Sequence, residues 1–143
     1  MLLIDYPYIS EFLIETIKKN NFPIVSTTSA RELISEEKLN WISETEAIQK
    51  FKENPNQLIY SNSENVINWV ENKLEFTKLP SQIEVFKNKI KFRELLKDVY
   101  PNYFFKGVKF EDLDVITIDN LQFPFIIKPS IGFFSLGVHK VDN

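Results

Sequence analysis

The stretch F-P-F-I-I-K-P-S-I-G-F-F-S-L-G-V, at residues 123–138, is the segment of this 143-residue chain that is most informative about its fold and function. Its apolar start predicts a buried strand over residues 125–128, because short apolar runs bounded by turn residues are typical of strands. A loop is expected over residues 129–135, and a second strand over residues 136–141. The segment therefore predicts two antiparallel strands joined by a glycine-containing loop.

The first of these strands ends in a lysine, Lys128, where a charge is hard to place. Lysine is rarely buried without a partner, and an unpaired ammonium in apolar surroundings is costly. The loop and the start of the second strand hold Gly132, Ser135 and Gly137, and glycines let backbone N–H groups come close to an anion. A cation beside such a loop predicts a phosphate site. The alternative is a plain hairpin whose glycines only satisfy the geometry of the turn.

A second motif lies upstream, N-K-I-K-F-R-E-L-L at residues 88–96. Together the two motifs resemble the ATP-grasp family. That family has a helix that supplies a first nucleotide lysine, then a strand that ends in Lys-Pro and a G-x-x-S-x-G-V loop over the ATP phosphates. Lys89 matches the first lysine and Lys128 the second, with Lys87 or Lys91 as alternatives for the first.

The resemblance implies that ATP is the cofactor and that Lys89, Lys128, Gly132, Ser135 and Gly137 contact it. It implies a parent enzyme that is an ATP-dependent carboxylate–amine ligase, which works through an acyl phosphate and takes a small-molecule carboxylate as substrate. The family's Mg²⁺ ligands lie in a later part that this sequence lacks, so the resemblance implies a truncated, inactive N-terminal fragment. The chain departs from the family where Phe133, Phe134 and Leu136 replace small or basic loop residues.

The first half of the chain alternates short apolar runs with segments of helical periodicity. This alternation predicts βαβ units and a parallel sheet. With the resemblance, the expected fold is α/β: a small Rossmann-like parallel-sheet domain at residues 1–78, then an incomplete ATP-grasp subdomain of a helix plus antiparallel strands at residues 79–143. No glycine precedes Gly107, which argues against a dinucleotide-binding G-x-G-x-x-G site in the first half.

Individual elements follow from caps and apolar runs. Strands are expected at residues 2–4, 22–26, 58–60 and 103–108, with strand propensity also at 115–118. Helices are expected after the caps Ser10, Ser29, Ser43, Ser61 and Ser81, the last of them ending at Pro101, and a short helix at residues 110–113.

The amino-acid composition argues against several classes of function. The formal net charge is −3 and gives no basic face for nucleic acid. The absence of cysteine excludes disulfides and thiol chemistry, and a single histidine excludes a multi-histidine metal cluster. No signal peptide or membrane-length apolar run is recognised, so a cytoplasmic protein without a membrane partner is expected.

Several residues have plainer interpretations. His139 is expected to be structural, and the acidic residues Glu111, Asp112, Asp114 and Asp119 to be solvated rather than metal ligands. Residues 5–8, D-Y-P-Y, follow the first strand, where open α/β sheets bind ligands, but a turn is preferred there.

The rival function is a non-catalytic α/β binding or scaffold module. An exposed strand edge would also allow two copies of the chain to associate.

Overall fold

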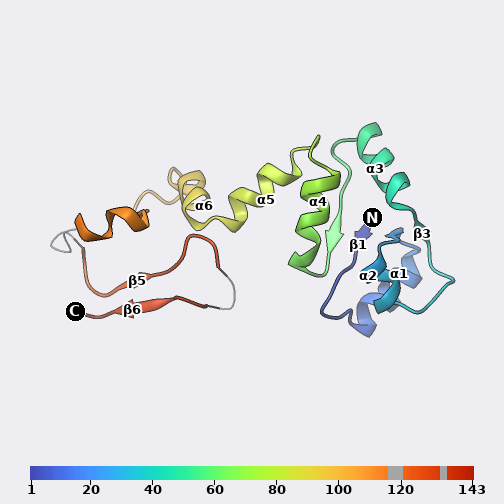
Figure 1. Cartoon of the computed structure of the whole chain (residues 1–143), viewed down its shortest axis with the longest axis horizontal. Helices are drawn as coiled ribbons and strands as arrows, with labels where there is room; N and C mark the ends of the chain where they lie inside the picture. The colour runs from blue at the N-terminus through green and yellow to red at the C-terminus, as the bar shows by residue number, and fades with distance from the viewer. Residues whose placement is uncertain (116–120, 133–134) are drawn as a thin grey trace. The chain divides into compact units, whose positions relative to one another are not determined.

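The computed structural model of the chain describes residues 1–115, 121–132 and 135–143. Contacts divide it into two compact parts, Met1–Gln82 and Ile83–Asn143, here called the N-terminal unit and the C-terminal unit. The fold is α/β, with a four-stranded parallel sheet in the first unit and an antiparallel strand pair in the second (Figure 1). The predicted domain boundary at residues 78/79 stays a prediction, while the division between these units falls four residues later.

Four short strands make the sheet of the N-terminal unit, all parallel, in the order β3-β2-β1-β4. They are β1 (Leu2–Leu3), β2 (Ile24–Val25), β3 (Trp41–Ile42) and β4 (Tyr60–Ser61). The chain adds β2 and β3 on one side of β1 and then returns to place β4 on the other side. The strands expected at residues 2–4 and 22–26 contain β1 and β2, and the strand expected at residues 58–60 overlaps β4 only at Tyr60, whereas β3 was not expected.

Helices connect and follow these strands. They are α1 (Glu11–Asn20), α2 (Thr28–Leu33), α3 (Glu44–Glu53), the 3₁₀ turn η1 (Glu64–Val66) and α4 (Ile67–Lys73). The predicted caps Ser10 and Ser43 are confirmed, since their hydroxyls accept from the backbone N–H of the third residue along.

Three cap predictions were wrong, two of them by two residues, while Ser81 lies inside the helix that begins at Leu79. Thr27, not Ser29, caps α2, because the helix begins directly after the turn that leaves β2. Ser63, not Ser61, caps η1, because the Ser61 hydroxyl is engaged with the backbone of Ser63 instead.

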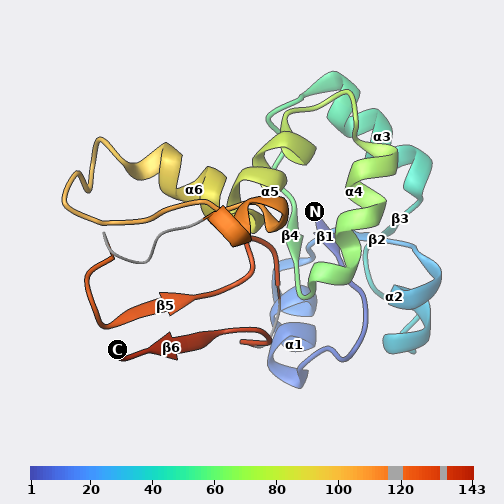
Figure 2. The same ribbon diagram turned by 60° about the vertical axis from the view of Figure 1, so that its left-hand side comes forward.

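The core of the N-terminal unit lies on the sheet. Side chains alternate between faces along a strand, and Leu2 and Ile4 pack with Ile17 of α1 and Ala30 of α2. On α3, Phe51 is fully buried. Figure 2 shows α1 and α2 on one side of the strands and α3 and α4 on the other. The amphipathic helices predicted from the sequence thus cover both faces of the sheet.

Two helices begin the second half of the chain, α5 (Leu79–Lys87) and α6 (Lys89–Leu96). The prediction of one continuous helix from Ser81 to Pro101 was wrong. Asn88 breaks it with an extended ψ of 108° while its side chain accepts from the N–H groups of Ile90 and Lys91. A residue that caps a new helix cannot also continue the old one.

The rest of the C-terminal unit contains η2 (Phe110–Val115), β5 (Phe125–Ile127) and β6 (His139–Val141). β5 and β6 pair antiparallel, with Ile126 opposite Lys140 (Figure 2). The sequence predicted this pair, but with longer strands. The helix expected at residues 110–113 is present as η2.

The strand expected at residues 103–108 was wrong: these residues carry no regular structure and pair with no strand that the structure describes. Strand propensity alone does not supply a pairing partner. Strand propensity was also noted at residues 115–118. Val115 belongs instead to η2, and residues 116–118 lie outside the described residues.

Candidate functional site

The loop between β5 and β6 folds around Pro129. A Cβ on Gly137 would lie 3.0 Å from Pro129 Cγ, and one on Gly132 would lie 3.6 Å from Pro129 Cβ. Gly137 also has a φ of +71°, which disfavours any other residue. The close approach of the loop to Pro129 therefore requires a glycine at Gly137, whereas a Cβ on Gly132 would make only an ordinary contact.

Ser135 is the second unusual backbone position of this loop. Its φ is +60°, rare for a residue other than glycine, asparagine or aspartate. The N–H of Val138 donates to its carbonyl oxygen at 3.2 Å, which closes a tight turn. Phe133 and Phe134 lie outside the described residues.

The two motifs meet through the backbone at the start of α6. Lys89 is the first residue of α6, and its N–H donates to the carbonyl oxygen of Ser130 at 2.8 Å. Only Pro129 separates Ser130 from Lys128. The structure thus brings the start of the helix motif to the Lys-Pro loop, although the residues are 41 positions apart.

The lysine side chains of the site differ in their environment. Lys89 is half-buried and Lys128 is exposed, and neither ammonium has a hydrogen bond or ion pair within the described part of the chain. Lys91, by contrast, forms an ion pair with Glu84. Of these helix lysines, Lys89 is therefore better placed than Lys91 to meet an external anion.

Residues near the hairpin do not extend the site. His139 is exposed on β6 opposite Ile127, and its structural role stays a prediction. Glu111 and Asp112 are exposed, while the side chains of Asp114 and Asp119 lie outside the described residues. Among residues 1–115, 121–132 and 135–143, no group of three acidic or histidine side chains could hold a metal ion.

The second location to consider is the carboxyl edge of the parallel sheet, where β1 and β4 are neighbours. The chain turns to opposite sides of β1 here, and such switch points are where open α/β sheets bind ligands. Asn62, after β4, spans the gap: its side chain accepts from the N–H of Asp5 at 2.9 Å and donates to the carbonyls of Asp5 and Tyr8 at 2.7 and 2.9 Å.

The other polar groups of this edge are also paired within the protein. The Asp5 carboxylate accepts from the N–H of Tyr6 at 2.7 Å, and the Tyr6 hydroxyl donates to Glu32. This hydrogen bond to Glu32 raises the pKa of Tyr6, as does the small desolvation of the phenol. Because these groups satisfy one another, the arrangement favours the interpretation of residues 5–8 as a structured turn.

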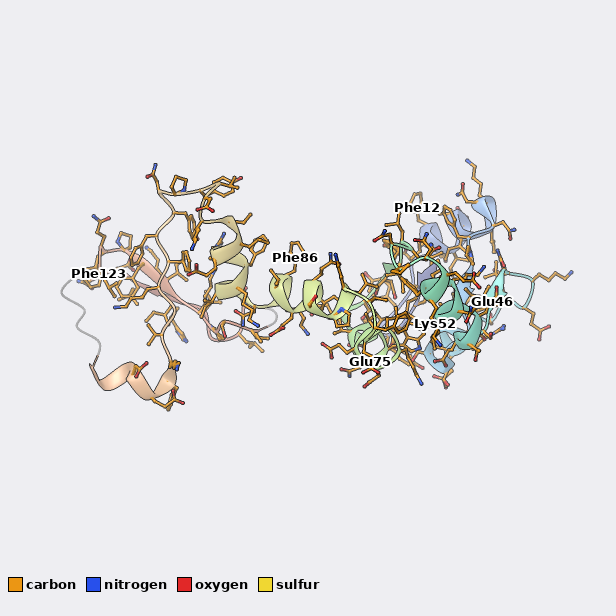
Figure 3. All side chains as sticks on the ribbon, turned by 90° about the horizontal axis from the view of Figure 1, so that it is seen from above. Phe12, Glu46, Lys52, Glu75, Phe86 and Phe123 are labelled. Atoms are coloured by element: carbon orange, nitrogen blue, oxygen red, sulfur yellow. The ribbon has the colours of Figure 1, made fainter. Side chains whose placement is uncertain are left out.

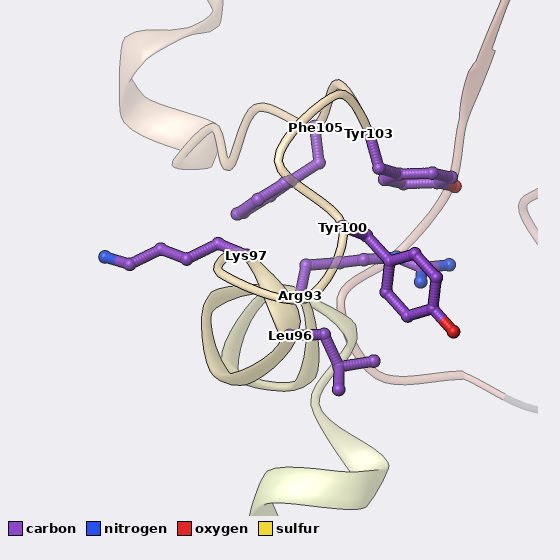
Figure 4. A pocket seen from close by; sticks show the side chains of 6 residues that line it. All are labelled: Arg93, Leu96, Lys97, Tyr100, Tyr103 and Phe105. Carbon is purple, nitrogen blue, oxygen red and sulfur yellow. The ribbon is translucent and has the colours of Figure 1, made fainter.

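Sequence reasoning missed a pocket in the C-terminal unit. It has a volume of about 160 Å³ and lies where the segment after α6 folds back on the helix (Figure 4). Its lining consists of Arg93, Leu96, Lys97, Tyr100, Tyr103 and Phe105. The signal was present in the aromatic run Y-P-N-Y-F-F at residues 100–105, which follows a helix that carries Arg93.

Comparison with known proteins leaves the family open. No protein-family model, no curated protein and no solved structure matches the chain significantly. In the part of the chain that the structure describes, every helix is too short or too polar to cross a bilayer.

Proposed function

We propose that the C-terminal unit is a nucleotide-binding part of the ATP-grasp type and that the loop between β5 and β6, with Lys89 and Lys128, binds ATP phosphates. The observation that carries this proposal is the hydrogen bond from Lys89 N–H to the Ser130 carbonyl. It joins the two motifs of the resemblance in one place. In this reading the whole protein is an ATP-dependent carboxylate–amine ligase, and ATP supplies the phosphoryl group that activates the carboxylate.

The electrostatics of the loop support phosphate binding. Lys128 is exposed beside a tight turn and has no carboxylate partner among the described residues. At an effective dielectric near 20, a phosphate charge about 4 Å from this ammonium would gain about 4 kcal/mol. The turn at Ser135 and Gly137 also departs from ordinary backbone geometry, as anion-binding loops do.

The N-terminal unit supports the same proposal at the level of fold. The strand order β3-β2-β1-β4 matches the first four strands of the Rossmann order 3-2-1-4-5-6. We propose that it is the Rossmann-like domain that precedes the ATP-grasp part in this family, in a cytoplasmic enzyme.

The described residues fit ATP phosphates better than they fit a metal ion. Lys89 and Lys128 offer cations, whereas no acidic cluster within the described ranges could hold Mg²⁺. We therefore assign no metal ligand, and no chemical step, to this chain.

Titration of the chain with Mg-ATP by isothermal calorimetry tests the proposal. Lys128→Ala should weaken binding tenfold or more, about 1.4 kcal/mol. Lys140→Ala is the matched control, because Lys140 lies in the same hairpin but pairs with Asp142 at 2.5 Å. An unchanged dissociation constant for Lys128→Ala, or equal losses for both variants, would refute the assignment.

One observation favours the rival function, a non-catalytic binding or scaffold module. The close approach of Gly137 to Pro129 and its positive φ account for this glycine without a ligand. If this alternative holds, Mg-ATP does not bind, yet Gly137→Ala still disrupts the hairpin, as loss of the β5–β6 cross-strand nuclear Overhauser effects would show.

We also propose that the hairpin can pair with a second copy. In the described structure β5 and β6 form a sheet of two strands, so each has an open edge, and Ile126 and Ile127 are 62% and 54% exposed. A sedimentation coefficient that stays constant with concentration would exclude this association.

A further inference from the structure

The pocket beside α6 combines aromatic faces with an unpaired cation. Arg93, on α6, places its guanidinium carbon 4.2 Å from the centre of the Tyr103 ring. No carboxylate lies within ion-pair distance of Arg93 anywhere in the described residues. Figure 4 shows the guanidinium extending to the side of the pocket where Tyr100 and Tyr103 lie. Stacking on a ring leaves the N–H edges of a guanidinium free to donate.

The remaining lining is apolar. Leu96 and Phe105 contribute hydrocarbon surface, and Lys97 contributes its stem, since its ammonium points away from the other lining residues in Figure 4. That ammonium lies 3.4 Å from Glu94 in an exposed ion pair, which holds it only weakly. Among the side chains that the structure describes, none that lines the pocket is acidic, so this lining is complementary to a negative charge.

The backbone holds this arrangement in place. The segment after α6 folds back on the helix, where a Cβ on Gly107 would lie 3.0 Å from Ile90 Cδ1. The N–H groups of Val99 and Tyr100 both donate to the Leu96 carbonyl, at 3.0 and 2.9 Å. The aromatic residues therefore come from a segment that is anchored to the helix carrying Arg93.

We propose that this pocket binds a small molecule with one flat ring and one anionic group, either a carboxylate or a phosphate. The ring would stack on the aromatic lining and the anion would accept from Arg93, which suits paired recognition of carboxylate and phosphate oxygens. A volume of about 160 Å³ is below the range of drug-sized sites, which limits the ligand to about one ring. The site shares no residue with the proposed phosphate loop, so the two proposals stand or fall separately.

Titrations of the ¹⁵N-labelled chain with benzoate and phenyl phosphate, followed by amide chemical shifts, test the pocket. At least one of the two should shift the amides of residues 93–105 in a saturable way, and the tighter probe identifies the anion. Benzamide lacks the charge and acetate lacks the ring, so each should bind at least tenfold more weakly. Benzamide binding as tightly as both anionic probes, or no saturation with either, would overturn the proposal.

Substitutions of Arg93 then test whether this residue is the cation that binds the anionic group. Arg93→Gln should weaken binding of the better probe at least tenfold, and Arg93→Lys, which keeps the charge but not the planar donor edge, should weaken it less. Lys109→Gln is the matched control, because Lys109 is an exposed cation of the same unit outside the pocket lining. Unchanged affinity in a folded Arg93→Gln variant would refute the role of Arg93. If that variant does not fold, the comparison of the anionic probes with benzamide on the unaltered chain decides.

Discussion

The C-terminal unit is richer in large hydrophobic residues than the N-terminal unit, yet the N-terminal unit is the one that buries them. All the buried hydrophobic side chains of the described structure lie between Leu2 and Leu74, and nine of them are less than 2% exposed. In the described part of the C-terminal unit no side chain is buried. Figure 3 labels two phenylalanines of this unit, Phe86 and Phe123, which are 67% and 43% exposed.

The difference follows from the number of layers. In the N-terminal unit, helices pack on both faces of a four-stranded sheet, so side chains from strands and helices cover one another. In the described residues of the C-terminal unit the only sheet is the β5–β6 pair, and two strands alone are marginally stable in water. We infer that most of the folding free energy of the chain resides in residues 1–82.

The largest test of this comparison is removal of a core side chain. Phe51 is 0% exposed, and Phe51→Ala should cost about 3–5 kcal/mol of unfolding free energy, because it removes apolar burial and leaves a cavity. Phe12→Ala is the matched control, since Phe12 is 79% exposed (Figure 3) and should change stability by less than about 0.5 kcal/mol. Urea unfolding followed by circular dichroism measures both. Similar losses for the two variants would contradict the assigned core.

Hydrogen exchange compares the two sheets directly. The N–H groups of Ile24 and Ser26 donate to Asn40 and Ile42 across the covered sheet, at 2.9 and 2.8 Å. Their exchange should be at least about 100-fold slower, after correction for intrinsic rates, than that of the amides of β5 and β6. Equal protection in both sheets would show that the C-terminal hairpin is as stable as the core. The two units would then not differ in stability.

The same contrast explains which elements the sequence could predict. Leu2–Ile4 and the stripes of α1 and α3 carry strong local patterns, and these predictions are confirmed. β3 was missed because Trp41 and Ile42 stand between polar neighbours. They become a strand only through pairing with β2, where Ile24 N–H donates to Asn40. A partner that is distant in sequence leaves no local pattern to read.

The errors of the second half have a related cause. Residues 103–108 have strand propensity, but in the described structure no neighbouring strand pairs with them. The break at Asn88 is a local competition between continuing one helix and capping the next, which apolar periodicity does not register.

For the candidate site, the sequence supplied the residues through the two motifs, and their proximity follows from one long-range contact, Lys89 to Ser130. The directions of the lysine side chains depend on packing and could not be predicted.

The carboxyl edge of the parallel sheet offers a smaller test of the N-terminal unit. Asn62→Ala removes three hydrogen bonds to the loop after β1 and leaves the Asp5 N–H without its acceptor. We expect a loss of about 2 kcal/mol, since an unsatisfied partly buried group costs more than the bond itself contributes. Asn72→Ala is the control, because its amide makes one exposed bond, to Asn68 at 2.8 Å. Equal melting temperatures for Asn62→Ala and Asn72→Ala would argue against a structural turn and reopen this edge as a ligand site.

The smallest test uses one matched pair of helix caps, Ser43 for α3 and Asn88 for α6. Either residue changed to alanine should cost about 1 kcal/mol locally. In Ser43→Ala this loss should lower the unfolding midpoint of the N-terminal unit, because α3 carries the buried Phe51. In Asn88→Ala it should instead speed exchange of the Ile90 and Lys91 amides about fivefold and leave that midpoint unchanged. If Asn88→Ala lowered the midpoint as much as Ser43→Ala, the two units would unfold as one cooperative structure. The C-terminal unit would then contribute to the free energy of unfolding, although the buried side chains of the described structure all lie within residues 1–82.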